Sequence, residues 1–108
     1  MFLKGVGVMF VNTTFDAKQS TFTIKVIGCF YFNIHKFFRH ATEQIKPSMR
    51  VIHLDLGGTR DIDVAGLAML LILLDCVNKN QQKLKIINAQ SRIIDVLDAA
   101  NIKQLFCM

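Results

Sequence analysis

An uncharged run of eleven residues, 64–74, constrains the fold more than any other part of the chain. It is too short to cross a bilayer, which takes about 20 apolar residues. Asp63 precedes the run, and its carboxylate can accept hydrogen bonds from the free amides of a first helical turn. The sequence therefore predicts a helix from Val64 to about Asn78. Because the helix is apolar nearly all round, we expect it to be covered on most sides, as a crossover helix on a sheet is.

Alternation of apolar and polar residues predicts strands on both sides of this helix. Val6, Val8 and Phe10 indicate a first strand, followed by a polar loop over residues 12–20. Residues 21–26 alternate more regularly, as in a strand with one buried face. Two further strands are predicted at residues 50–56, ended by a sharp turn at the glycine pair 57–58, and at residues 84–89.

Helical spacing of apolar residues appears twice more. Asn33 is expected to cap a helix that reaches Ile45 and ends before Pro47, and Ser91 is expected to cap a final helix. Ile102, Leu105 and Phe106 are apolar enough to dock back on the body. The order of elements predicts an α/β fold, a mixed β-sheet of about four to five strands with three to four helices packed against it. We expect one domain over residues 1–108.

Composition narrows the functional classes. With 52% hydrophobic residues and one proline, the chain shows no linker and no tendency to disorder. The net charge of +5 is scattered and lacks an aromatic-basic signature, so we expect no nucleic-acid binding. The amino terminus lacks the apolar segment and cleavage site of a secretory signal, so the expected location is the cytoplasm, without direct membrane insertion.

The residues that commonly carry chemistry form no motif here. Cys29, Cys76 and Cys107 are far apart and include no CxxC pair, so we interpret them as reduced thiols. His35 and His40 are five residues apart, which is not the spacing of a helical metal pair. We expect no catalytic residue, metal or cofactor, although a small-ligand pocket between helix and sheet stays open.

The second half of the chain resembles the STAS family, named for sulphate transporters and anti-sigma factor antagonists. Four segments carry the resemblance: VIHLDL at 51–56, IDVAGL at 62–67, KLKIINA at 83–89 and SRIIDVL at 91–97. STAS domains typically have an apolar strand ending near an aspartate, a turn, an Asp-Ser-Ser-Gly-Leu-like motif opening an apolar helix, and a closing helix. The resemblance implies this fold for the chain.

The resemblance also implies a site and identifies a missing group. In anti-sigma factor antagonists, a partner kinase that is also the anti-sigma factor phosphorylates a serine at the start of that helix, and only the unphosphorylated form binds it. The matching positions here, Val64 and Ala65, have no hydroxyl. The phosphorylation switch in that form is therefore expected to be absent. Thr59 is a weaker alternative phosphosite, and Ser91 is better explained as a cap.

The implied function is a non-enzymatic protein-interaction module. The residues expected to contact the partner are Gly58, Thr59, Arg60, Asp61, Asp63, Val64, Ala65, Gly66 and Leu67. The partner class is a serine kinase/anti-sigma factor; the alternative is the ATPase of a bacterial ABC lipid-transport complex, of which the chain would be a small STAS subunit. A homodimer through the amino-terminal strand stays open.

Overall fold

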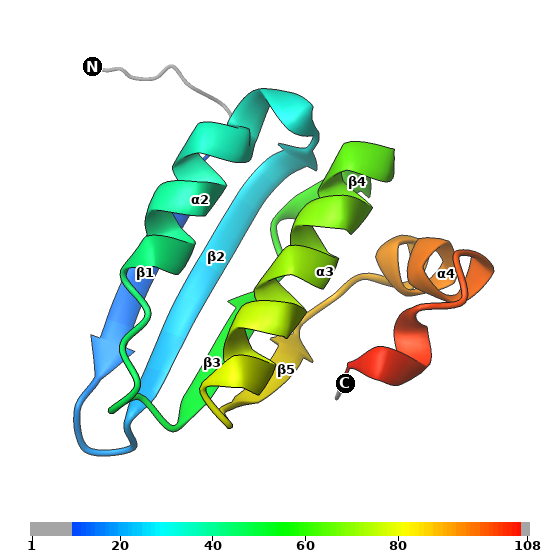
Figure 1. The fold of residues 1–108 in the computed structure, drawn as a ribbon. Helices are drawn as coiled ribbons and strands as arrows, with labels where there is room; N and C mark the ends of the chain where they lie inside the picture. The colour runs from blue at the N-terminus through cyan, green and yellow to red at the C-terminus, as the bar shows by residue number, and fades with distance from the viewer. Residues whose placement is uncertain (1–9, 107–108) are drawn as a thin grey trace, which may run out of the picture.

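The computed structural model describes residues 10–106 (Figure 1). In chain order the elements are β1 (Phe10–Asp16), β2 (Thr21–Phe30), the 3-10 turn η1 (Phe32–Ile34), α2 (His35–Glu43), β3 (Val51–Asp55), β4 (Thr59–Ile62), α3 (Val64–Lys79), β5 (Lys83–Ile87), α4 (Ser91–Ala99) and the 3-10 turn η2 (Lys103–Leu105). The predicted strand at Val6 and Val8 lies outside the described residues, and Phe10 begins β1.

The strands form one mixed sheet, which confirms the predicted α/β class. Its order is β1-β2-β3-β5, and β4 also pairs with β2. β1 is antiparallel to β2, whereas β3, β4 and β5 run parallel to their neighbours. Because β1 is an edge strand of the described sheet, pairing with a second copy there stays a prediction.

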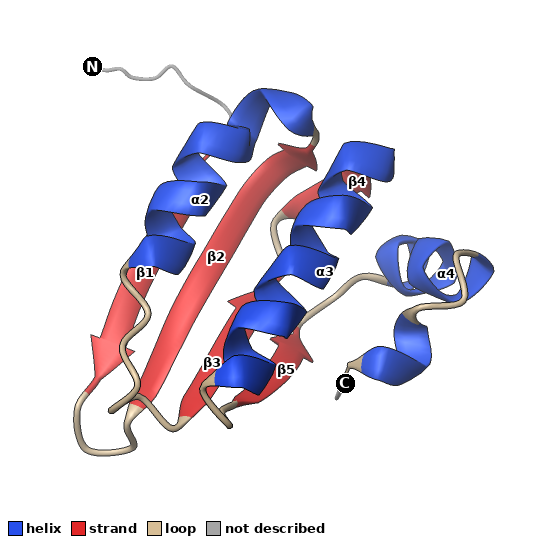
Figure 2. Ribbon diagram, viewed as in Figure 1, coloured by secondary structure: helices blue, strands red, loops and turns tan. Residues whose placement is uncertain are grey.

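Helices α2 and α3 lie side by side over one face of the sheet (Figure 2). The side chains of Ile24, Leu54 and Ile86 point to this face and are buried beneath the helices. Lys25 and Lys85, on neighbouring register positions, point to the opposite face and are exposed. The core is therefore one layer of side chains between the sheet and two helices.

Helix α4 lies beside the sheet, next to β4, and does not cover either helix (Figure 1). Its Ile93 and Leu97 are fully buried, and Phe106 after it is 7% exposed. The prediction that the tail docks on the body is confirmed for Phe106. Leu105 differs, because half of its side chain is exposed.

Three local predictions are wrong. Residues 12–16 belong to β1 rather than to a loop, because an edge strand needs few apolar residues and its threonines suit extended backbone. Asn33 does not cap α2, since the chain makes a 3-10 turn first and Ile34 occupies the N-cap position. Ser91 is the first residue of α4, and the extended Gln90 precedes it as the N-cap.

The segment after the glycine pair is also corrected. The sequence predicts a sharp turn at residues 57–58, but the chain continues in the same direction into β4. β2 is long enough to pair with β3 over residues 21–25 and with β4 over residues 28–30. The glycines make a local break between two strands that share one long partner. Gly28, with φ of 97°, sits at the bulge where the register shifts.

Helix α3 confirms the prediction of its extent but not of its burial. It begins at Val64 and ends at Lys79. Its apolar side chains were expected to be covered on most sides, yet Val64 is 82% exposed, Ile72 67% and Leu71 40%. The reason is that α3 has the sheet below it and α2 on one flank, while no described element lies above it.

Gly66 fixes how closely α3 approaches the sheet. The glycine is buried in the first turn of α3, and a Cβ atom there would lie 2.1 Å from the backbone oxygen of Phe30. The contact atom is main chain at the end of β2, so a side chain cannot be accommodated by a rotamer change. Gly66 therefore serves close backbone packing inside the chain.

We predict that Gly66→Ala lowers the free energy of unfolding by about 1–3 kcal/mol, as overpacking does, although alanine has the higher helix propensity. Urea denaturation measures the change. Val64→Ala, an exposed neighbour, is the control and should stay within about 0.5 kcal/mol of the parent. A Gly66→Ala protein as stable as the parent would show that the close contact is not limiting.

Candidate functional site

The candidate site lies at the edge of the sheet where the parallel strands end. β2 ends at Phe30, β4 ends at Ile62, and α3 begins two residues later. The first turns of α2 and α3 are both at this edge (Figure 1). Parallel α/β sheets commonly place binding sites at the carboxyl ends of their strands.

The first turn of α3, residues 63–67, forms what we call the α3 tip. The predicted cap is confirmed: the Asp63 carboxylate accepts a hydrogen bond of 2.8 Å from the Gly66 amide. Val64 projects outward and is the most exposed large hydrophobic residue of the described chain. Ala65 and Leu67 are half-buried on either side of it. The α3 tip therefore presents a neutral, apolar surface without a hydroxyl.

The preceding strand places the other predicted contact residues differently. Gly58 is half-buried, and Arg60 is exposed. Thr59 is fully buried, and its hydroxyl donates a hydrogen bond of 2.7 Å to the backbone oxygen of Val26. The alternative phosphosite at Thr59 is thus contradicted, because a kinase cannot reach a buried hydroxyl that is already engaged. Thr59 belongs to the strand's packing.

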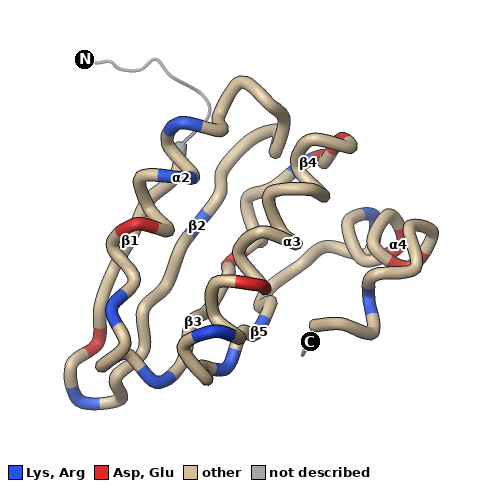
Figure 3. Tube along the Cα trace, in the orientation of Figure 1, with Lys and Arg blue, Asp and Glu red and all other residues tan. Residues whose placement is uncertain are grey.

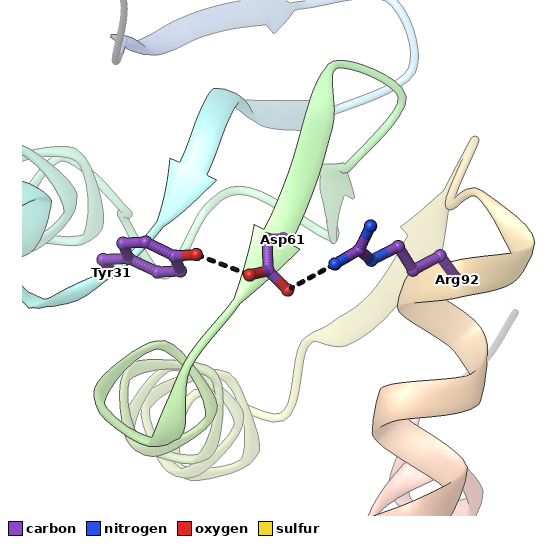
Figure 4. A network of polar contacts seen from close by, with 3 residues as sticks. All are labelled: Tyr31, Asp61 and Arg92. Carbon is purple, nitrogen blue, oxygen red and sulfur yellow. Dashed lines mark hydrogen bonds and ion pairs between the residues drawn. The ribbon is translucent and has the colours of Figure 1, made fainter.

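Asp61 belongs to a polar network that the sequence does not reveal (Figure 4). The Tyr31 hydroxyl donates a hydrogen bond of 2.5 Å to Asp61 Oδ2, and the Arg92 guanidinium lies 3.9 Å from Asp61 Oδ1. These residues come from the end of β2, from β4 and from the first turn of α4. Since 30 and 31 residues separate them in the chain, only the pairing of Cys29 with Asp61 brings them together.

The network shifts the ionisation of both acidic groups. The Tyr31 hydrogen bond lowers the pKa of Asp61, helped by the Ile62 amide and the charge of Arg92. The hydrogen bond to Asp61, followed by partial burial and contact with Cys29, raises the pKa of Tyr31 to about 12. The lowered pKa stabilises the fold above the usual Asp range and loses this effect as pH falls through the lowered value. The raised pKa stabilises the fold up to pH 10 and loses its effect towards pH 12.

The described residues do not assemble a recognisable catalytic or metal site. Within residues 10–106, no group of three His, Cys, Asp or Glu side chains could hold a metal ion. Cys29 and Cys76 are free thiols, and Cys107 lies outside the described range. His35 stacks on the ring of Phe32 at 4.3 Å between centroids. Among the helices described, none has the length and apolar character needed to span a bilayer.

Comparisons with known proteins identify the family. The STAS domain model matches residues 12–108. The chain belongs to the STAS domain family. A STAS-domain containing protein of Pseudomonas aeruginosa (strain UCBPP-PA14) is 30% identical over 91 residues, which are 84% of this chain and 90% of the relative.

Solved structures agree on the fold of this STAS domain. A sulfate transporter family protein from Wolinella succinogenes superposes with a TM-score of 0.74 at 15% identity, over 85% of this chain and 74% of the other. An anti-sigma-factor antagonist (STAS) domain protein from Planctomyces limnophilus gives a TM-score of 0.72 at 14% identity, over 90% and 86%. At such identities the likeness concerns architecture alone, and the two proteins are named for different functions.

Tyr31 is the chain's one tyrosine and tryptophan is absent, so its ionisation can be followed alone. We predict that phenolate absorbance rises with a midpoint near pH 12, the raised pKa of Tyr31. Asp61→Asn should move this midpoint towards the ordinary value of about 10, because it removes the carboxylate that favours the neutral phenol. Ultraviolet titration measures the midpoint, with circular dichroism to confirm folding at each pH.

The matched control for this titration is Asp75→Asn, which removes an exposed carboxylate paired with Lys79 on α3. It should leave the Tyr31 midpoint unchanged. A midpoint that stays near pH 12 in Asp61→Asn would contradict the role assigned to the Tyr31–Asp61 hydrogen bond.

We further predict that Thr59→Val lowers the free energy of unfolding by about 1–2 kcal/mol, because it keeps the shape and removes the buried hydrogen bond to Val26. Thr23→Val, on the face of the sheet that α2 and α3 leave open, is the control and should change stability by less than about 0.5 kcal/mol. Urea unfolding measures both. Equal effects of the two substitutions would contradict a special role for the Thr59 hydroxyl.

Proposed function

We propose that this STAS domain is a cytoplasmic, non-enzymatic interaction module whose α3 tip binds a serine kinase/anti-sigma factor and does so without a phosphorylation switch. The observation that carries the proposal is Val64, which is 82% exposed at the first turn of α3. In the antagonists that this chain resembles, the positions occupied here by Val64 and Ala65 carry the phosphorylated serine.

The chemistry of the α3 tip suits constitutive binding. Exposed apolar side chains lose contact with water when a partner covers them, which favours association. A phosphate at this place would add about −1.5 to −2 charges and oppose such contact. Neither Val64 nor Ala65 can carry one. Control of binding then has to come from the partner, for example from its nucleotide state or its abundance.

The edge of the site supplies polar contacts around the apolar centre. Arg60 is exposed beside the α3 tip, and the Tyr31–Asp61–Arg92 network holds a carboxylate in its charged form close by. A binding surface with an apolar centre and a polar rim is the usual anatomy of protein interfaces. We therefore include Arg60 and Asp61 with Asp63, Val64, Ala65 and Leu67 in the contact surface, with Gly58, Thr59 and Gly66 as its support.

A second candidate is a small STAS subunit that binds the ATPase of an ABC lipid-transport complex. The observation that favours it is the length of the exposed apolar surface, which continues from Val64 to Leu71 and Ile72 along α3. Permanent interfaces are larger and more apolar than transient ones. A stably bound subunit would keep this surface covered.

We predict that Val64→Asp abolishes partner binding, because it places a negative charge where a phosphate would stand in the antagonists. Helix α3 should tolerate the change, since an acidic residue is favourable in a first turn. The measurement is affinity purification of the tagged chain from its native cells, with identification of the proteins recovered. A serine-kinase-like ATPase recovered with a sigma factor supports the first candidate, and transporter subunits support the second.

The control is Leu105→Asp, the same kind of change at a half-exposed apolar residue of η2. It should recover the same partner as the parent. If Val64→Asp recovers the partner as well as Leu105→Asp does, the α3 tip is not the contact surface. If phosphate were found on this chain after incubation with the partner and ATP, the claim of a missing switch would be wrong.

A further inference from the structure

An apolar groove runs between α2 and α3 on the outer side of the helix layer. It encloses about 160 Å³ and is lined by His35, Phe38, Arg39, Thr42, Met69 and Ile72. Phe38 is buried in the floor, whereas Ile72 is 67% exposed on the wall. The two helices lie side by side along the groove (Figure 1). No described element covers it.

The α3 wall continues the apolar surface of the α3 tip. At 100° per residue, positions four, three and four apart fall on one flank of a helix. The flank towards α2 carries Ala65, Met69, Ile72 and Cys76, and the adjacent outward stripe carries Val64, Ala68 and Leu71. The first charged side chain of α3 is Asp75. The wall is therefore apolar and neutral for nearly three turns.

The α2 wall is basic. Its first two turns carry His35, Lys36, Arg39 and His40, and Glu43 at the far end is the one acidic residue of the helix. Neither Lys36 nor Arg39 forms an ion pair with another residue of the described range. Figure 3 shows these cations on α2 facing an uncoloured first half of α3. The groove thus has an apolar floor, one apolar wall and one unneutralised cationic wall.

We propose that this groove binds an acidic amphipathic helix of a partner protein, an inference that rests on the proposed function and names the chemistry of the partner. The apolar stripe of such a helix enters the groove with residues at i, i+3, i+4 and i+7. Its acidic flank lies over Lys36 and Arg39. Because α2 has nine residues, about 13 Å of helix, the occupant needs about three turns.

Charge distinguishes this occupant from a second copy of the chain. A symmetric dimer across the groove brings the same patch of both chains together. Two basic α2 walls would then face each other and repel. The acidic helix instead neutralises a wall that lacks counter-charges within the described residues, and it extends the contact made at the α3 tip without requiring a change in either helix.

The test uses a fluorescein-labelled, hydrocarbon-stapled helical peptide of about 12 residues, with leucine at i, i+3, i+4 and i+7 and glutamate elsewhere. The staple is needed because short helices are marginal in water. Fluorescence anisotropy with the full chain measures affinity. The acidic peptide should bind about tenfold more tightly than the same peptide with lysine for glutamate. Ile72→Glu and Arg39→Glu should each weaken its binding about tenfold.

Matched controls carry the same changes away from the groove. Leu105→Glu corresponds to Ile72→Glu, and Lys103→Glu corresponds to Arg39→Glu; both should bind the acidic peptide as the parent does. Circular dichroism confirms that each variant is folded. Val64→Asp should retain peptide binding even where it loses the protein partner, so that a failure at the α3 tip is distinguishable from a failure of the groove.

Four results would overturn the proposal. The first is equal affinity for the acidic and lysine peptides, or none for either, and the second is unchanged affinity in Ile72→Glu. The third is a dimer that Ile72→Glu converts to a monomer by sedimentation, which would make a second copy the occupant. The fourth is an Ile72-dependent association with phosphatidylglycerol vesicles that exceeds binding of the peptide, which would assign the groove to an anionic lipid.

Discussion

The contact between the first turn of α3 and the end of β2 determines the geometry of the whole site. Gly66 allows the helix backbone to reach the Phe30 carbonyl, and Asp63 closes the same turn through the Gly66 amide. With both interactions made, the outward side of the turn has one direction to face. Val64 is therefore exposed because its neighbours are fixed, and the apolar α3 tip is a consequence of how the helix is attached to the sheet.

The regular parts of the fold could be predicted because each is encoded within a short stretch of chain. The alternation in residues 21–26 and the cap at Asp63 are local signals, and both predicted elements are found. β4 could not be predicted in this way. Its four residues have no apolar alternation of their own, since they are held by a parallel partner that is 31 residues earlier in the chain.

The candidate site divides along the same line. Val64, Ala65 and the cap are read from one motif, whereas Tyr31 and Arg92 join Asp61 only after β2 and β4 are paired and α4 is placed beside them. The burial of Thr59 is a further case. Its hydroxyl looks available in the sequence, but the register of β4 on β2 places it under the sheet's helices and gives it the Val26 carbonyl as an acceptor.

The unequal covering of α3 explains why an apolar sequence does not yield a fully buried helix. Two helices on one face of a small sheet leave the outer side of each helix in water, and α4 is held at the edge of the sheet by Ile93 and Leu97 instead of lying over them. Core packing therefore accounts for Leu70, Leu73 and Val77 but not for Val64, Leu71 and Ile72. Because exposed apolar residues on a helix do not stabilise the isolated chain, their placement in one continuous stripe beside a cationic wall is better explained by contact with another molecule than by folding.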